Sequence, residues 1–133
     1  MKQIFVNLPV KDLKRSKDFW ANLGFGFDAR FTDDKAACLV IEKDHIHAML
    51  LTEPFFQTFL TGRAIADAKK STEVLIALSC SSDEEVKDFV AKASKAGGRP
   101  FRDPRDHGFM YEHAFEDPDG HVWELFHMRE MPK

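Results

Sequence analysis

The first half of the chain alternates hydrophobic and polar residues in short stretches, with one helical pattern between them. Residues 4–8 (IFVNL) alternate with the period of two that is typical of a strand. After Asp12, apolar residues recur at helical spacing, which predicts a helix that begins at this N-cap and ends at Gly24. Further strands are predicted at residues 25–31, 36–41 and 45–52, separated by polar turns at 32–35 and 42–44.

The second half repeats this order of elements. Residues 74–80 (VLIALSC) are apolar and predict a strand, and Ser82 with Glu85 forms a capping box at the start of a helix. Gly97 and Gly98 end that helix. The remaining strands are predicted at residues 99–102, 109–115 and 121–128, with a polar loop at 103–108 and a turn at 117–120 (DPDG).

The two halves also share identical residues. Residues 17–19 (KDF) match residues 87–89 (KDF) at an offset of 70 positions. Together with the shared element order, this match indicates one strand, one helix and three strands in each half. We therefore predict a single domain over residues 1–133, with one module at about 2–53, a short helical connector at 54–70 and a second module at about 71–128.

Composition and charge exclude several classes of protein. The chain has 133 residues, of which 44% are hydrophobic and 31% charged, as in a soluble globular domain. The net charge is −3 and no basic stretch stands out, which argues against nucleic acid binding. No apolar segment is long enough for a signal peptide or a membrane span, so we expect a cytoplasmic protein without membrane association. Cys38 and Cys80 lie in apolar stretches, and we interpret them as reduced core residues.

Two segments resemble the vicinal oxygen chelate superfamily, which includes glyoxalase I, the bleomycin and fosfomycin resistance proteins and extradiol dioxygenases. They are residues 10–25 (VKDLKRSKDFWANLGF) and 115–126 (FEDPDGHVWELF), and the two-module layout extends the match over 2–127. The resemblance implies an α+β fold of two βαβββ modules, whose sheets curl into a cup with the helices outside. It also implies a homodimer.

The resemblance further implies four metal-ligand positions in the cup, two on each module. In this sequence they fall on Phe5, Leu50, Leu75 and Glu124. Phenylalanine and leucine cannot coordinate a divalent cation, which needs three or four N, O or S ligands. We therefore expect no metal and no other cofactor, with a divalent metal at a relocated site as the minor alternative. His45 and His47 are predicted to point away from the cup.

The alternation predicts what the cup contains. With Phe5, Leu50 and Leu75 inward, Asn7 and Phe126 also face inward. If Asp117 lies opposite Gly120 in the closing turn, the register pairs His113 with Glu124 and Tyr111 with Phe126, so that all four share the cup face. A loop of three residues would shift the register by one and separate them. The 13 phenylalanines fit either an aromatic core or an aromatic ligand cup.

Two functions from different classes follow. The leading hypothesis is a binding protein for a small apolar or aromatic molecule, with Phe5, Asn7, Leu50, Leu75, Tyr111 and Phe126 lining the site. The alternative is a glyoxalase-like lyase or isomerase that uses His113 and Glu124 as an acid–base pair, in which the carboxylate raises the imidazole pKa. The simpler interpretation of the same pair, and the favoured one, is two polar side chains that only satisfy each other. A dimerisation or regulatory module is a third, less favoured class.

Overall fold

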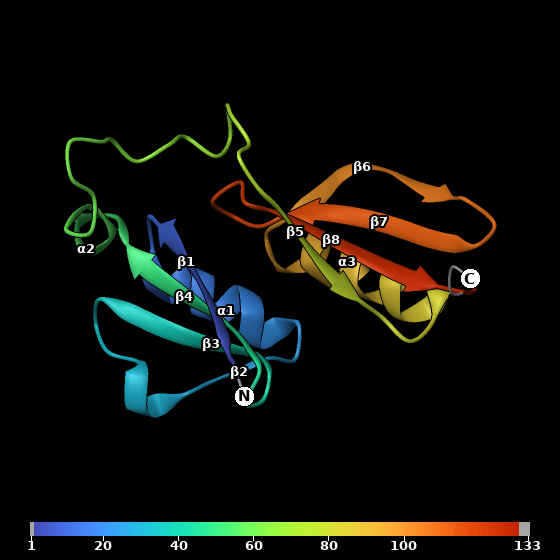
Figure 1. The fold of residues 1–133 in the computed structure, drawn as a ribbon, viewed down its shortest axis with the longest axis horizontal. Coiled ribbons are helices and arrows are strands. Elements are labelled where there is room, and N and C mark those ends of the chain that lie inside the picture. The colour runs from blue at the N-terminus through green and yellow to red at the C-terminus, as the bar shows by residue number, and fades with distance from the viewer. Residues whose placement is uncertain (1, 131–133) are drawn as a thin grey trace. The chain divides into compact units, whose positions relative to one another are not determined.

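Both modules form, and each is a four-stranded sheet with a long helix on one face. In the computed structural model of the protein, residues 2–130 are described, and the chain divides into two compact units between Asp67 and Ala68 (Figure 1). The boundary falls inside the expected connector. The α+β fold of paired βαβββ modules is therefore confirmed.

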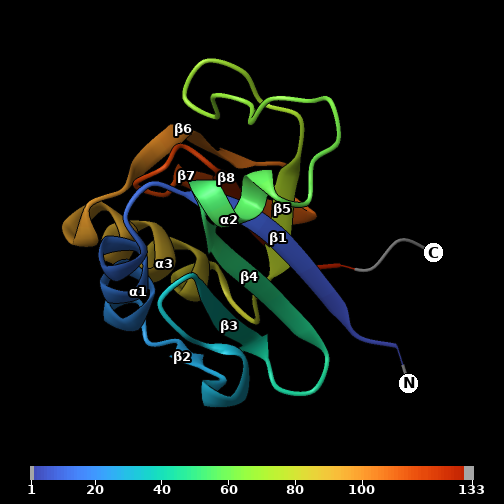
Figure 2. The same cartoon turned by 90° about the vertical axis from the view of Figure 1, so that its left-hand side faces the viewer.

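The first unit has the sheet order β1-β4-β3-β2, in which β1 and β4 are parallel. Helix α1 packs on one face of this sheet, against β3 and β4 (Figure 2). Asp12 caps the helix because its side chain accepts a hydrogen bond of 3.0 Å from the backbone N–H of Arg15. The elements are β1 (Ile4–Val10), α1 (Leu13–Asn22), β2 (Gly26–Phe27), β3 (Ala36–Glu42), β4 (Ile46–Thr52) and α2 (Glu53–Gln57).

The second unit repeats the topology with the sheet order β5-β8-β7-β6. Half of the predicted capping box forms at α3, where Ser82 Oγ accepts from the backbone N–H of Glu85 at 3.0 Å. The Glu85 carboxylate accepts from the backbone N–H of Ser81 at 2.7 Å, one residue before the N-cap. Gly97 ends the helix in the left-handed conformation, with a φ of 116°. The elements are β5 (Leu75–Ser79), α3 (Asp83–Ala96), β6 (Arg99–Asp106), β7 (Met110–Glu116) and β8 (Val122–Met128).

Three predicted elements differ from the structure. The strand expected at 25–31 is only β2, because the Asp28 side chain accepts from Arg30 N and starts a 3₁₀ turn over Ala29–Phe31. The loop expected at 103–108 is mostly strand, since β6 continues through two bulges to Asp106. The helical connector is only α2, and no helix or strand forms over residues 58–74. No helix over residues 2–130 is both long and apolar enough to cross a membrane.

The hairpin between β7 and β8 has a register that differs by one from the expected register. Asp117 N donates to the carbonyl of His121 at 3.0 Å, so the loop between them has three residues. The Asp117 side chain holds this loop by accepting from the backbone N–H groups of Asp119 and His121, each at 3.0 Å, and from Trp123 Nε1 at 3.1 Å. Glu124 consequently pairs with Ala114, and the predicted pairing with His113 is wrong.

Candidate functional site

Each sheet has one face covered by a helix and one face that the helices of its own unit leave open. In the first unit, β1 shows the alternation clearly: Leu8 and Val10 are buried, whereas Phe5 and Asn7 are exposed. Phe5 and Asn7 therefore lie on the open face, as predicted. Phe5 remains 40% exposed despite its size.

Strand β4 places other side chains on this face than we expected. Phe5 pairs with His47 across the parallel β1–β4 ladder, and their rings stack with centroids 4.5 Å apart. His47 is only 5% exposed, and its Nδ1 atom has no hydrogen-bond partner. The prediction that His47 points away from the cup is thus wrong, because it shares the open face with Phe5. Met49 pairs with Asn7 and shares the open face.

Leu50 lies on the helix-covered face, which corrects its predicted place in the cup. It pairs with Leu8 and is 1% exposed. The error came from aligning the β4 sequence with that of β8 one residue out of step, and a shift of one residue turns every side chain of a strand to the other face. Met49, not Leu50, therefore corresponds to the family's ligand position on this strand.

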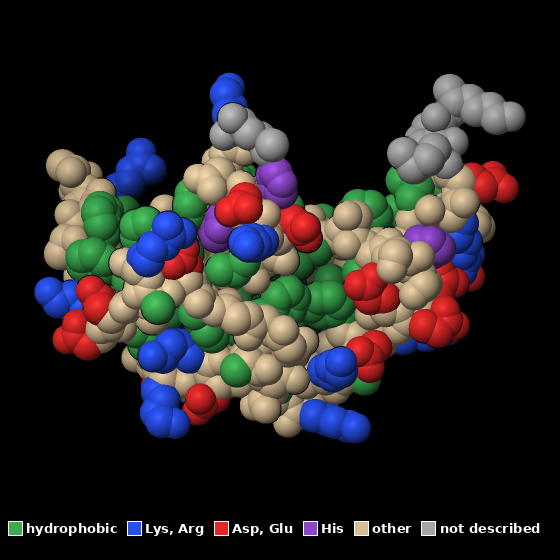
Figure 3. Space-filling model, turned by 90° about the horizontal axis from the view of Figure 1, so that it is seen from below, with side chains coloured by type: hydrophobic (Ala, Val, Ile, Leu, Met, Phe, Trp, Pro, Cys, Tyr) green, Lys and Arg blue, Asp and Glu red, His purple; other side chains and the backbone are tan. Residues whose placement is uncertain are grey.

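In the second unit, Leu75, Glu124 and Phe126 lie on the open face, as predicted. Leu75 pairs with Val122, while Glu124 and Phe126 pair with Ala77 and Ser79 of β5. Leu75 is 50% exposed. On the side of the molecule drawn in Figure 3, hydrophobic side chains reach the surface between acidic and basic ones.

Arg102 of β6 connects Glu124 to a second carboxylate, Glu112 of β7. Arg102 Nη2 donates to Glu124 at 2.7 Å and to Glu112 Oε1 at 3.3 Å. The same Glu112 oxygen lies 3.8 Å from Arg105 Nη1 and 3.6 Å from His107 Nε2. Glu112 is the cross-strand partner of Phe126, so an aromatic ring lies beside the cluster.

His113 lies on the opposite face of the second sheet, where α3 covers it. Its cross-strand partner is Leu125, which is fully buried. Burial lowers the pKa of His113, and the positive charge of Arg102 lowers it further. We expected a carboxylate neighbour that raises this pKa, so both the location and the direction of the shift were wrong. His113 and Glu124 cannot act as an acid–base pair in this arrangement.

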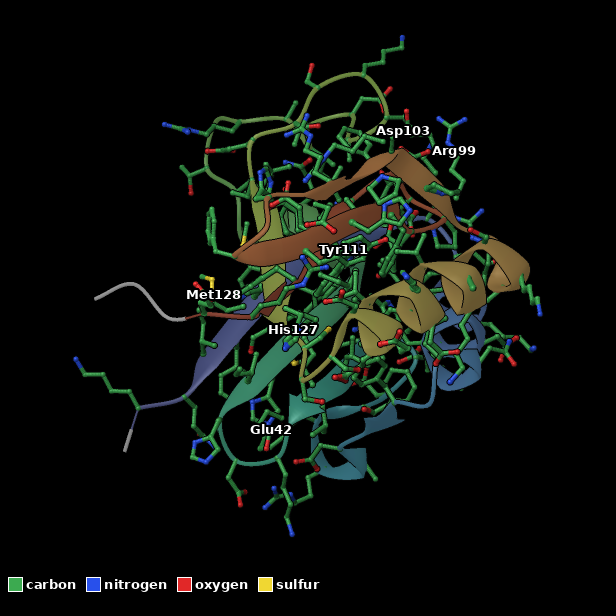
Figure 4. All side chains as sticks on the ribbon, turned by 90° about the vertical axis from the view of Figure 1, so that its right-hand side faces the viewer. Glu42, Arg99, Asp103, Tyr111, His127 and Met128 are labelled. Carbon is green, nitrogen blue, oxygen red and sulfur yellow. The ribbon has the colours of Figure 1, made fainter. Side chains whose placement is uncertain are left out.

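Tyr111 also lies on the α3 side and is nearly buried (Figure 4). Lys87 of α3 has its Nζ 5.4 Å from the centroid of the Tyr111 ring. His127, the cross-strand partner of Tyr111, has its Nδ1 2.9 Å from Asp83 Oδ1 at the start of α3. Hydrogen bonds from Arg129 and His127 lower the pKa of Asp83 to about 2. These contacts fasten α3 to β8, and they place Tyr111 away from the open face.

The residues present do not fit the family's divalent metal site. The four positions carry Phe5, Met49, Leu75 and Glu124, and only one of these side chains is a carboxylate or an imidazole. Over residues 2–130, no group of three or more His, Cys, Asp and Glu side chains lies close enough together to hold a metal ion.

A cavity of about 290 Å³ lies near the end of α3, and its charged groups are paired. Arg99 and Glu116 form an ion pair across its edge, and Asp117 accepts from Trp123. The cavity therefore presents no buried, unpaired group that indicates a ligand. It is lined by Lys69, Gly97, Gly98, Arg99, Glu116, Asp117 and Pro118.

The residues that we missed were Arg102, Arg105, His107, Glu112, His47 and Met49. Arg105 and His107 fell in the segment that we took for a loop, so its charges were not assigned to a sheet face. One signal was present for Glu112, because it is an acidic residue inside the apolar strand FMYEHAF. A three-residue turn would have placed it beside Phe126.

Comparison with known proteins identifies the family. The sequence model of the Glyoxalase/Bleomycin resistance protein/Dioxygenase superfamily matches residues 2–125. None of the curated proteins matches the sequence significantly.

Three solved structures illustrate the similarity in fold. Hypothetical protein SA1046 from S. aureus is 26% identical, with 95% of this chain and 93% of that chain covered and a TM-score of 0.77. A glyoxalase-related enzyme from Fulvimarina pelagi is 19% identical, with 99% and 92% covered and a TM-score of 0.81. The fosfomycin resistance protein FosX from Listeria monocytogenes is 19% identical, with 100% and 95% covered and a TM-score of 0.68. With the family match spanning nearly the whole chain and the same fold in these structures, the protein belongs to the Glyoxalase/Bleomycin resistance protein/Dioxygenase superfamily.

Proposed function

We propose that this protein binds a small apolar or aromatic molecule on the open faces of its sheets, without a metal ion. The observation that carries the proposal is the 2.7 Å ion pair between Glu124 and Arg102. Glu124 is the one carboxylate among the four family ligand positions, and a guanidinium already neutralises it. A divalent cation there would have to displace Arg102, and it would find one carboxylate where it needs three or four ligands.

The apolar residues on the open faces support binding of an apolar molecule. Phe5 is 40% exposed and Leu75 is 50% exposed, and each lies at a family ligand position. Large hydrophobic side chains left in water at a functional position indicate a surface that a ligand covers. Burying apolar area contributes about 25 cal/mol per Å², so even part of a phenyl ring adds measurable affinity.

The lyase or isomerase hypothesis loses the residue pair on which it rested. His113 faces α3, whereas Glu124 is on the open face and bonded to Arg102. No other observation on the described residues favours that reaction, so we do not propose it.

A thermal-shift screen of aromatic metabolites and antibiotics tests the proposal. We expect some compounds to raise the melting temperature in the presence of a chelator, because binding to the native state stabilises it by about 2.7 kcal/mol at a hundredfold excess over Kd. The variant Leu75→Trp should reduce the shift, since the larger side chain fills the open face.

Val74→Trp is the matched control. Val74 is 54% exposed, close to the value for Leu75, and it directly precedes β5, so we expect its side chain to continue the alternation and point to the other side. This variant should keep the full ligand-induced shift. Stabilisation that requires Zn²⁺, Ni²⁺ or Mn²⁺ and disappears in Glu124→Ala would refute metal-independent binding.

A further inference from the structure

Three donor side chains of the second unit converge on one carboxylate oxygen. Glu112 Oε1 lies 3.3 Å from Arg102 Nη2, 3.8 Å from Arg105 Nη1 and 3.6 Å from His107 Nε2. Two permanent positive charges and one imidazole therefore surround a single oxygen atom. Such an arrangement is typical of sites that recognise an oxyanion.

Glu112 occupies this position loosely. Charge-assisted N–H···O bonds are usually about 2.7–2.9 Å long, and all three of its distances are longer. Glu124, in contrast, accepts from Arg102 at 2.7 Å. Glu124 is therefore the tightly bound carboxylate, and Glu112 is the one that another anion can replace at a lower cost in free energy.

Arg102 has donor capacity that these contacts do not use. A guanidinium carries five N–H groups, and the bonds to Glu112 and Glu124 both come from Nη2. Arg102 Nε is buried and donates to no acceptor. A buried donor without an acceptor is costly, so an incoming carboxylate that bonds both Nε and Nη2 would relieve the cost.

The cluster is open to solvent on one side. The Arg105 side chain is 60% exposed and that of His107 is 38% exposed, whereas Arg102 and Glu112 are mostly covered. A small anion can therefore approach past Arg105 and His107. Phe126 lies beside Glu112 as its cross-strand partner, so an aromatic ring is available next to the charged groups.

We propose that the cluster of Arg102, Arg105 and His107 binds the carboxylate of a small aromatic acid, and that Glu112 is an internal stand-in which this ligand displaces. The displaced Glu112 side chain turns to solvent, while Arg102 keeps its bond to Glu124. This inference rests on the proposed function and narrows it: the apolar part of the ligand packs on Phe126, and its carboxylate meets Arg102.

The test uses benzoate as the probe and benzyl alcohol as its uncharged counterpart, with binding measured by NMR titration of the full chain. We expect benzoate to bind at least about tenfold more tightly, because a hydrogen bond to a charged group contributes about 1.5–3 kcal/mol. Glu112→Gln should increase the benzoate affinity several-fold, since it removes the competing charge, and Arg105→Gln should lower it. Arg99→Gln is the control, because Arg99 is also on β6 but pairs with Glu116, and it should bind benzoate as the wild type does.

Two results would overturn the inference. One is equal affinity for benzoate and benzyl alcohol, which would leave the proposed apolar site standing without the carboxylate contact. The other is an unchanged or weaker benzoate affinity in Glu112→Gln, which would show that Glu112 is not a displaceable stand-in. Arg105 and Arg99 are exposed and Glu112→Gln keeps the size of its mostly covered side chain, so retained chemical-shift dispersion confirms that the three variants are folded.

Discussion

Leu50 and Leu75 allow a direct test of which face of each sheet packs into the hydrophobic core. Leu50→Ala removes the same atoms from β4 of the first unit as Leu75→Ala removes from β5 of the second unit. Leu50 is 1% exposed and Leu75 is 50% exposed. A fully buried Leu→Ala change costs about 2–5 kcal/mol, because the lost transfer free energy is joined by the cost of the cavity. At the half-exposed position no closed cavity forms, and we expect less than about 1 kcal/mol.

These free energies convert to melting temperatures. A chain of 133 residues has an unfolding entropy that corresponds to about 4 °C per kcal/mol when it unfolds as one cooperative unit. Leu50→Ala should therefore lower the melting temperature by about 8–20 °C, and Leu75→Ala by less than about 4 °C. Calorimetry together with urea denaturation measures both values. The face assignment is refuted if Leu75→Ala costs as much as Leu50→Ala, or if Leu50→Ala costs nothing.

Three further predictions concern the second unit and the glycines. His113 has a lowered pKa, so its NMR titration midpoint should lie below about 6.5, the ordinary value. The free energy of unfolding should fall as the pH drops from about 6.5 through that midpoint, and His113→Phe should abolish this pH dependence. Asp83 has a pKa of about 2, so its contribution to the free energy of unfolding is complete above about pH 4 and is lost as the pH falls toward 2. Arg129→Met should therefore shift acid unfolding, monitored by circular dichroism, to higher pH. An unchanged acid midpoint would contradict this. Gly120→Ala should lower the free energy of unfolding by more than about 1 kcal/mol, because φ is 90° and an added Cβ would lie 3.0 Å from a backbone nitrogen. Gly62→Ala should lower it by less, because φ is 69° and no atom lies within 4 Å of the added Cβ. Urea denaturation measures both values.

The order of elements could be predicted from the sequence because it depends on local patterns. Asp12 and Ser82 cap their helices as expected, since each cap needs only a side chain and the backbone two or three residues ahead. The family could be predicted as well, because its two motifs contain the Asp12 cap and the DPDG turn.

The faces of the later strands could not be predicted with the same security, because they depend on register. The same sequence allows two loops. In one, Asp117 lies opposite Gly120 and two residues separate them; in the other, Asp117 lies opposite His121 and three residues separate them. The buried Asp117 side chain favours the second arrangement because it accepts a hydrogen bond from Trp123 Nε1 of the next strand, a contact that the alternation pattern does not reveal. A single-residue difference of this kind moved His113 and Tyr111 under α3 and brought Glu112 beside Arg102.

The homodimer expected from the resemblance stays a prediction. Light scattering at several protein concentrations measures it directly, and a mass of 15.3 kDa at every concentration would exclude it.

The ion pair between Arg102 and Glu124 has a consequence for the conditions under which the protein works. A metal site depends on which ion the surroundings supply, whereas a guanidinium is part of the chain and is charged at every physiological pH. Ligand binding through this cluster would therefore be indifferent to chelators. It would respond to ionic strength mainly through Arg105, whose side chain is 60% exposed, because dissolved salt screens exposed charges with a Debye length of about 8 Å at 0.15 M. Under the metal-independent binding that we propose, ligand affinity would depend on dissolved salt and not on the supply of a metal ion.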